Sequence, residues 1–331
     1  MNDASSTTTR DVVVIGGGPA GLSAALVLGR ARRSVTVVDA GDPRNACSPS
    51  LHGFLTRDGA SPADFLAAAR REVRGYGVEL VTDEVVTVVD DDGAGFRVTL
   101  AGGSTLRARR VIAATGIADE LPDIDGVAER WGRDALHCPY CHGYEVRDRP
   151  LAVVARLAEG AVHQALLLRQ WSDDVTLLLH DVRSADLGVE GRALLDARGV
   201  TVVDGRVREL VVTDDRVTCT RLSDGAEVPC AAVFLSPRFR LRAGPLAALA
   251  PDVVENDMGV HLATDDEGRT SVHGLWAVGN LADLSAQVLG AAELGSRAAI
   301  GINGELALED AHAAAQVPVG PAGVPARGAV E

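Results

Sequence analysis

The sequence has few aromatic residues and no long apolar run. Phe, Trp and Tyr make up 3% of its 331 residues, so a core must be built from the Val, Leu and Ala within the 47% hydrophobic share. No apolar stretch approaches the ~20 residues that cross a bilayer. The N-terminus, 1–9, lacks a basic segment followed by an apolar one. We therefore expect no membrane span and no signal peptide, and we predict that 1–9 is disordered.

Positive charge and cysteine are also scarce. The 32 basic residues face 46 acidic ones, giving a formal net charge of -14. Such acidity repels a phosphate backbone and argues against a nucleic-acid partner. An odd and small cysteine count does not suit a secreted disulfide framework, so we expect a cytoplasmic protein. The cysteines are Cys47, Cys138, Cys141, Cys219 and Cys230.

A strand–helix–strand unit lies near the start of the chain. The strand 11–15 enters a turn in which Gly16, Gly18 and Gly21 form a GxGxxG pattern, and a helix follows from about 22 to 32. These glycines let the backbone approach a pyrophosphate at the helix N-terminus. Asp39 ends the next strand, where an acid accepts hydrogen bonds from a ribose hydroxyl. The unit predicts a dinucleotide site.

A second strand–helix–strand pattern follows about 140 residues later, which with the chain length suggests two domains. A further helix is expected at 63–76, and further strands between 78 and 114 and between 200 and 237. A late strand at 274–279 precedes a helix from about 287 to 302. The Ala/Pro/Gly-rich tail, 311–331, lacks hydrophobic periodicity and is predicted to be disordered. The repeated unit itself spans 151–180.

The motif HCPYCHGYE, at 137–145, contains a Cys-x-x-Cys pair. Such a pair lowers the pKa of one thiol and can exchange with a disulfide. It could also be structural, or bind zinc with the flanking histidines or with Cys219 and Cys230, although ten residues separate the latter two. Cys-Pro-Tyr-Cys is the glutaredoxin tetrapeptide as well, but glutaredoxins are small and carry it near their start. We favour a redox disulfide between Cys138 and Cys141, and no metal.

Four motifs in this order resemble the thioredoxin-reductase group of FAD-dependent disulfide oxidoreductases. They are GGGPAG at 16–21, ATG at 114–116, the CxxC, and GLWAVGNLADLSAQV at 274–288. The resemblance implies an α/β fold of two Rossmann-like, three-layer ββα domains, the second inserted into the first, and a homodimer. The implied FAD-binding domain comprises 10–118 and 242–310, and the inserted domain comprises 119–241.

The resemblance also implies residue roles. Cys141 would face the flavin and Cys138 would exchange with substrate. His142 stands where the group carries Asp, and its ordinary pKa of about 6.5 suits it to general acid–base catalysis. Asn280 also replaces an Asp and can still hydrogen-bond a hydroxyl. Beyond the glycine loop, the implied FAD contacts are Arg44, Asn45, His52, Thr115, Gly116, Gly279, Asn280, Gln287 and Val288.

The second nucleotide loop lacks its glycines. Arg156-Leu-Ala-Glu-Gly160 follows the strand, so Leu157 would crowd a phosphate and Glu159 would repel it. A helix dipole contributes only ~0.3–1 kcal/mol, too little to offset a misplaced carboxylate. Where the group has a His-Arg-Arg cluster, His180-Asp-Val-Arg183 holds one arginine. NADPH binding therefore stays open, since Arg156 could still hold a phosphate.

These features resemble the dithiol oxidases of gliotoxin and holomycin biosynthesis. The leading hypothesis is oxidation of a small-molecule dithiol to a disulfide through Cys138, Cys141 and FAD, with oxygen as acceptor. One alternative is an NADPH-dependent thioredoxin or disulfide reductase. Another is a flavin-bound redox sensor without turnover. The sequence does not identify the dithiol.

Overall fold

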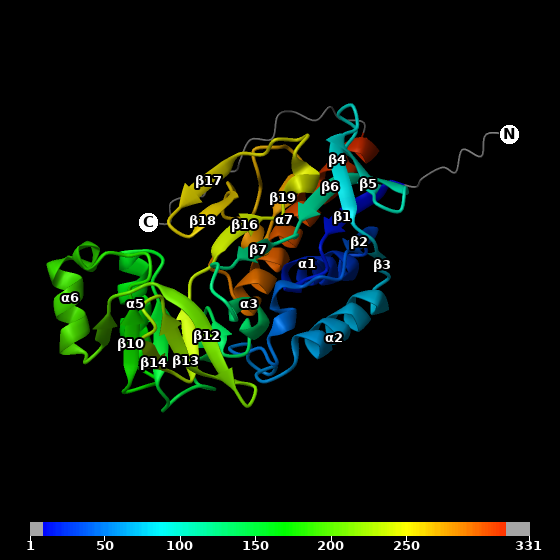
Figure 1. Cartoon of the computed structure of the whole chain (residues 1–331). Helices are drawn as coiled ribbons and strands as arrows, with labels where there is room; N and C mark the ends of the chain where they lie inside the picture. The colour runs from blue at the N-terminus through cyan, green and yellow to red at the C-terminus, as the bar shows by residue number, and fades with distance from the viewer. Residues whose placement is uncertain (1–8, 316–331) are drawn as a thin grey trace, which may run out of the picture.

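The computed structural model describes residues 9–315, which form two lobes (Figure 1). The blue-to-cyan first third of the chain and the orange-to-red last part build one lobe together, while the green middle part builds the other. The N-terminal segment predicted to be disordered, 1–9, lies outside the described residues except for Thr9. Among residues 9–315, no helix is both long enough and apolar enough to cross a membrane.

The first lobe is built on a seven-stranded sheet. Its parallel part pairs β3, β2, β1 and β6 in that order, and β5 and β4 continue it antiparallel. The second half of β6 also pairs in parallel with β19, so a strand from far along the chain completes the same sheet. The bounds are β1 (Arg10–Ile15), β2 (Val35–Asp39), β3 (Glu79–Thr82), β4 (Val85–Asp90), β5 (Phe96–Leu100), β6 (Thr105–Ala113) and β19 (Leu275–Ala277).

Alternating side chains of β1 face two cores. Val12 and Val14 pack with α1 (Pro19–Arg30), α2 (Pro62–Gly75) and α7 (Val288–Ala315), whereas Val13 and Ile15 pack with β4 and β5 on the other face. This is the period-two alternation of a strand buried on both faces. Helices α1 and α7 cross so closely that a Cβ on Gly295 would lie 2.0 Å from the carbonyl oxygen of Ala20.

Helix α7 is longer than the sequence predicts. It runs to Ala315, so the prediction of disorder from residue 311 was wrong for 311–315, and 316–331 lie outside the described residues. Asp310 anchors this end, because it accepts hydrogen bonds from Arg33 at 2.6 Å and from Arg109 at 2.8 Å. The long-range ion pairs could not be read from the local pattern.

The second lobe contains a parallel five-stranded sheet, in the order β11, β10, β9, β15, β8. Helices α5 and α6 pack on one face, and an antiparallel three-stranded sheet of β12, β13 and β14 packs on the other. The bounds are β8 (Ala135–Leu136), β9 (Leu151–Val154), α5 (Ala158–Leu168), β10 (Val175–Leu178), η2 (Ser184–Leu187), α6 (Gly188–Ala197), β11 (Thr201–Val203), β12 (Val207–Thr213), β13 (Arg216–Leu222), β14 (Glu227–Pro229) and β15 (Ala232–Leu235).

The chain passes between the lobes in two adjacent strands. β7 (Ile117–Glu120) leaves the first lobe, β16 (Arg238–Leu241) returns to it, and the two pair antiparallel. The hairpin of β17 (Val253–Asn256) and β18 (Gly259–Leu262) extends this pair to a four-stranded sheet. The α/β class with two Rossmann-like three-layer domains is therefore confirmed, while the predicted domain boundaries stay a prediction.

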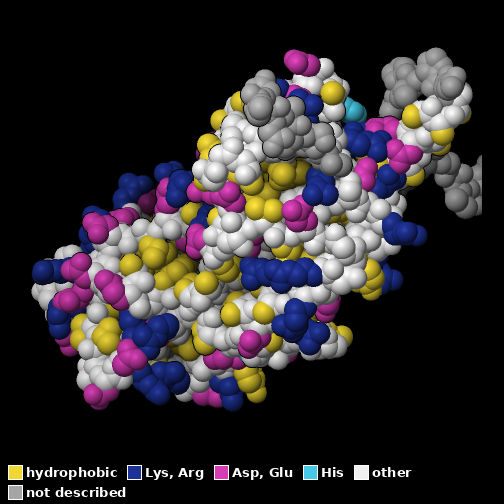
Figure 2. All heavy atoms as spheres, turned by 90° about the vertical axis from the view of Figure 1, so that its right-hand side faces the viewer, with side chains coloured by type: hydrophobic (Ala, Val, Ile, Leu, Met, Phe, Trp, Pro, Cys, Tyr) yellow, Lys and Arg dark blue, Asp and Glu magenta, His cyan; other side chains and the backbone are white. Residues whose placement is uncertain are grey.

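The remaining helical elements are short and lie in the loops between the longer helices and strands. They are η1 (Arg44–Cys47), α3 (Val127–Arg130), α4 (Pro139–His142), η3 (Gly244–Leu246) and η4 (Gly279–Leu281). Acidic and basic side chains are interspersed over the face in Figure 2. The sequence contains no lysine. Apart from the contacts of His52 and His180 with carboxylates, the ion pairs of the described residues are therefore made by arginine guanidinium groups, which can form two parallel hydrogen bonds to one carboxylate.

Candidate active site

The glycine loop between β1 and α1 has no room for a side chain at the first and last glycines of its GxGxxG pattern. Gly16 has φ +107°, and a Cβ there would lie 2.4 Å from the carbonyl oxygen of Ala114. A Cβ on Gly21 would lie 2.0 Å from the carbonyl oxygen of Gly16. A Cβ on Gly18 would have no atom within 4 Å, so this position faces open space at the start of α1. The loop thus leaves a helix N-terminus accessible to a phosphate.

Asp39 ends β2 beside this loop, since a Cβ on Gly17 would lie 2.6 Å from its Oδ2. Arg70 of α2 donates a hydrogen bond to the same Oδ2 at 2.7 Å. The backbone N–H of Gly41 approaches Oδ1 at 3.3 Å. The carboxylate is therefore held in place with acceptor capacity remaining, as a ribose contact requires. Arg70 was not singled out from the sequence.

A cavity of about 1630 Å³ runs from this loop to the dithiol segment. That exceeds the ~300–1,000 Å³ of most ligand pockets and suits a large ligand together with a substrate. Of the site residues predicted from the sequence, Gly21 is the one that does not line it. The residues that do are Gly16, Gly18, Asp39, Arg44, Asn45, His52, Thr115, Gly116, Cys138, Cys141, His142, Gly279, Asn280, Gln287 and Val288.

The cavity walls near α1 fit FAD. The hydroxyl of Thr115 is buried and has no hydrogen-bond partner among the described residues, so it is available to a ligand. Gly279 has φ +65°, and a Cβ there would lie 2.9 Å from that of Ala20. The amide nitrogen of Asn280 donates to the carbonyl oxygens of Asp283 at 3.1 Å and Ala286 at 2.9 Å. This fixes the turn before α7 and leaves the amide oxygen of Asn280 as an acceptor.

Two predicted FAD contacts bind the protein itself. The guanidinium of Arg44 forms a bidentate pair with Asp119 of β7, with N–O distances of 2.7–3.1 Å, and lies 4.9 Å from the ring centre of Phe239. His52 approaches Asp58 at 3.3 Å through Nδ1 and Glu145 at 3.4 Å through Nε2. Their role as FAD ligands stays a prediction.

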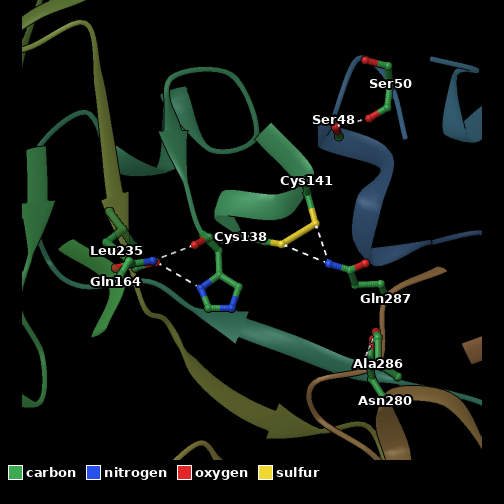
Figure 3. Close-up of a disulfide and its surroundings, with 10 residues drawn as sticks. Ser48, Ser50, Cys138, Cys141, Gln164, Leu235, Asn280, Ala286 and Gln287 are labelled. Atoms are coloured by element: carbon green, nitrogen blue, oxygen red, sulfur yellow. Dashed lines mark hydrogen bonds between the residues drawn. A yellow bond between two sulfur atoms is a disulfide. The ribbon is translucent and has the colours of Figure 1, made fainter. Parts of the chain in front are cut away.

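The two cysteines of the CxxC form a disulfide at the start of α4, with Cys138 as the N-cap (Figure 3). The side-chain nitrogen of Gln287 lies 3.6 Å from Sγ of Cys138 and 3.7 Å from Sγ of Cys141. The following Gly143 abuts Trp171, since a Cβ would lie 2.7 Å from its ring. The structure thus brings the predicted redox pair to the residue predicted to lie along the flavin.

Two histidines flank the pair and differ in their surroundings. Burial lowers the pKa of His142, which the nearby Glu145 carboxylate opposes. Its ring makes no hydrogen bond within the described residues, so both nitrogens are available. Burial also lowers the pKa of His137, and the Arg44 charge adds to the effect. Because Nδ1 of His137 lies 3.2 Å from the carbonyl oxygen of Leu235, its ring is fixed in the protein.

The second nucleotide loop is built as the sequence indicates. Glu159 lies in the first turn of α5, and the side chain of Leu157, at its N-cap, is 46% exposed. Arg183 forms hydrogen bonds of 2.6 and 3.0 Å to Asp186. Nδ1 of His180 accepts the backbone N–H of Val207 at 3.1 Å. The groups that could replace a phosphate-binding cluster are thus already paired.

The other cysteines lie apart from this chemistry. Cys219 and Cys230 are buried, and burial raises the pKa of Cys230 to about 12, so both stay protonated thiols. Cys47, in contrast, is exposed beside the cavity. In the described range, no group of three or more His, Cys, Asp or Glu side chains is placed to hold a metal ion.

A family model described as pyridine nucleotide-disulphide oxidoreductase matches residues 10–314. Thioredoxin reductase sirT of Leptosphaeria maculans is 31% identical, covering 88% of this chain and 93% of that protein. Thioredoxin reductase tcpT of Claviceps purpurea is 35% identical, covering 68% of this chain and 72% of that protein. These matches confirm the resemblance to thioredoxin reductases.

Solved structures agree with this relationship. The crystal structure of HlmI is 50% identical with a TM-score of 0.86, covering 93% of this chain and 96% of that one. An oxidoreductase from Agrobacterium tumefaciens is 36% identical with a TM-score of 0.85, covering 91% of this chain and 99% of that one. The similarity extends over both lobes.

Proposed function

The chain belongs to the pyridine nucleotide-disulphide oxidoreductase family as a flavin-dependent disulfide oxidoreductase of the thioredoxin-reductase type, and we propose that it oxidises a small-molecule dithiol to a disulfide. The observation that carries this proposal is the contact of Gln287 with both sulfurs of the Cys138–Cys141 disulfide at one end of a cavity whose second nucleotide loop carries Leu157 and Glu159 in place of glycines. Electrons can then enter through the cysteines without a nicotinamide.

The exchange takes place in two steps. One substrate thiolate attacks Sγ of Cys138, the bond between Cys138 and Cys141 breaks, and Cys141 leaves as a thiolate. The second substrate thiolate then attacks the substrate sulfur of the mixed disulfide and releases the Cys138 thiolate. The substrate loses two electrons and closes its disulfide, and the cysteine pair gains them. The amide N–H groups of Gln287 are placed to stabilise the leaving thiolate.

His142 would handle the protons. Because burial lowers its pKa, the ring is neutral at pH 7 and can accept the proton of a substrate thiol. FAD, held by the glycine loop, Thr115 and the turn at Gly279, would supply the two-electron acceptor that restores the disulfide, with oxygen as final acceptor. These FAD contacts are among those that the resemblance to thioredoxin reductases implies.

The direction is supported by the second nucleotide loop. A 2′-phosphate would share Arg183 with the carboxylate of Asp186, and a pyrophosphate would meet the carboxylate of Glu159 at the start of α5. An uncompensated like charge at a helix N-terminus opposes anion binding. A small dithiol needs neither site. We also propose a homodimer, on the resemblance alone, and a cytoplasmic location, on the cysteine content alone.

A second candidate is an NADPH-dependent disulfide reductase. It is favoured by one observation besides the names of the relatives: Arg156 lines the cavity next to α5 and has no ion pair within residues 9–315. A guanidinium there could hold one phosphate. The two candidates differ in whether a nicotinamide reduces the flavin.

The test is aerobic turnover without nicotinamide. The purified yellow protein should consume oxygen with a small dithiol such as reduced dithiothreitol, and peroxide should accumulate in step with the disulfide. The Cys138→Ser variant, which changes one atom outside the glycine loop and should therefore keep the fold and the flavin, is the matched control for flavin-only oxidation. Equal oxygen uptake by the variant would refute the exchange, and uptake that requires NADPH would favour the reductase.

A further inference from the structure

One segment of the first lobe, residues 42–58, reaches across to the second lobe before α2 begins. At its start, Asp42 accepts a hydrogen bond of 2.7 Å from Arg242, directly after β16. Two residues later, Arg44 holds Asp119 of β7 by a bidentate pair in which the aspartate side chain is only 10% exposed. We call residues 42–58 the clamp segment, because it binds both strands that join the lobes.

The clamp segment also contacts the second lobe itself. At Gly132 a Cβ would lie 2.8 Å from both the carbonyl oxygen and the Sγ of Cys47, so the two backbones are in close contact. Beyond η1, Nε2 of His52 lies 3.4 Å from Oε1 of Glu145, three residues after the CxxC helix α4. The contacts are thus spread from the connecting strands to the dithiol segment.

The position of the disulfide depends on how the lobes are oriented. Cys138 and Cys141 belong to the second lobe, whereas Gln287, which contacts both sulfurs, belongs to the first. The clamp segment passes beside this contact, since a Cβ on Gly53 would lie 3.8 Å from Oε1 of Gln287. A rotation about β7 and β16 that separated Cys141 from Gln287 would have to break the clamp contacts.

We propose that the clamp segment positions the Cys138–Cys141 pair at Gln287, with Asp119 and Glu145 as its anchoring points. Neither carboxylate contacts a sulfur atom, so both are positioning residues. The proposal rests on the proposed electron exchange between the cysteine pair and the flavin. It applies whichever direction this protein takes.

The experiment uses the flavoprotein carrying Asp119→Asn, Glu145→Gln, or both. Under anaerobic mixing with dithiothreitol, two rates are followed: opening of the disulfide, by acid quench and thiol labelling, and loss of the visible flavin band. Opening requires access of the dithiol to Cys138 and only one N–H contact of Gln287 with the leaving thiolate, so it should slow less than flavin reduction. Flavin reduction also requires the cysteine pair to stay at the flavin and should slow about tenfold, as expected for a lost charged hydrogen bond. Flavin content should be unchanged.

A second readout is independent of turnover. Hydrogen–deuterium exchange of the peptide spanning 42–58 should be faster in the double variant than in the wild type. Glu120→Gln is the matched control, because Glu120 pairs with Arg240 at 3.2 Å within the same two strands, and neither side chain makes an ion pair with the clamp segment in the described structure. The control should leave both rates and the exchange unchanged.

The possible outcomes test the clamp segment separately from the proposal that the protein oxidises a dithiol. Equal slowing of disulfide opening and flavin reduction, or unchanged hydrogen exchange in the clamp segment, would overturn the clamp. If the wild type does not react with dithiothreitol at all, the dithiol-oxidase proposal is weakened. The clamp is then decided by hydrogen exchange alone, where unchanged protection contradicts it and selective loss of protection supports it.

Discussion

The side-chain nitrogen of Gln287 lies 3.6 Å from Sγ of Cys138 and 3.7 Å from Sγ of Cys141, although 149 and 146 residues separate them in the chain. Gln287 immediately precedes α7, the helix that packs on α1 behind the glycine loop. One amide therefore connects the disulfide to the dinucleotide site. An N–H donor at this place favours the thiolate over the thiol, as the exchange chemistry requires.

Replacing Gln287 by Met removes this donor while keeping a side chain of similar length. We expect flavin reduction by a dithiol to slow about tenfold, because a hydrogen bond to a charged group contributes about 1.5–3 kcal/mol. The thiolate fraction of the reduced pair should fall as well, measured by the ultraviolet thiolate absorbance against pH. Ser285→Ala is a nearby control, since within residues 9–315 the Ser285 hydroxyl bonds only Asp283 of its own turn. An unchanged thiolate titration in the Met variant would contradict the role given to the amide.

Replacing each of the two cysteines by serine should have a different effect on disulfide exchange. Cys138→Ser removes the sulfur that is attacked, so no adduct should form with an activated disulfide reagent at the pair. Cys141→Ser leaves Cys138 without its resolving partner, so a stable mixed disulfide should accumulate there. Intact-protein mass spectrometry followed by peptide mapping distinguishes the two. A trapped adduct on Cys141 in the Cys138→Ser variant, with none in the other variant, would reverse the assignment.

The buried histidines should make stability fall at acidic pH. Burial lowers the pKa of His137 and of His142 in the folded state, while both titrate near 6.5 when unfolded. As the pH falls below about 6.5, the unfolded chain therefore binds protons that the folded chain does not, and the free energy of unfolding decreases until the pH passes the lowered pKa values. Above that range the contribution is fully present.

Urea unfolding at several pH values measures how the free energy of unfolding changes with pH. A His137→Gln variant should show a smaller loss of stability between about pH 7 and pH 5 than the wild type, because one linked proton is removed. His273→Gln, at a position that is not buried, is the control. A slope that is equal in all three proteins would show that carboxylates, and not these histidines, set the acid limit.

Two glycines of the dinucleotide loop should respond differently to alanine. Gly18→Ala places a methyl group in open space at φ -79°, so the protein should fold with nearly wild-type thermal stability. The same methyl group points toward the expected pyrophosphate, so flavin affinity should fall. Gly21→Ala must displace the Gly16 carbonyl from a contact of 2.0 Å and should destabilise the fold itself. Thermal unfolding and the ratio of flavin to protein separate the two effects, and full flavin retention by Gly18→Ala would place the pyrophosphate elsewhere.

Much of the fold could be predicted because its signals are local. The strand of 11–15, the GxGxxG turn and the acid at Asp39 lie within one short stretch and follow the period of each element. The second strand–helix–strand unit and the loss of its glycines were visible for the same reason. By contrast, the pairing of β7 with β16 joins segments about 120 residues apart and has no local pattern.

The environment of the site was less accessible from the sequence. Arg44 and His52 stand where cofactor ligands are expected, yet their partners Asp119 and Glu145 belong to distant segments. Only three-dimensional packing shows that a charged side chain in a loop is already paired. Likewise, the exposure of Cys47 and the extension of α7 to Ala315 depend on tertiary contacts that helix and loop propensities do not report.

The most direct measurement is anaerobic mixing of the purified flavoprotein with NADPH, and separately with a small dithiol, while the visible flavin band is recorded. The account predicts no rapid bleaching by NADPH or NADH, bleaching by the dithiol, and recovery of colour with release of peroxide when air is admitted. Rapid bleaching by NADPH, with none by the dithiol, would contradict it and identify the protein as a reductase.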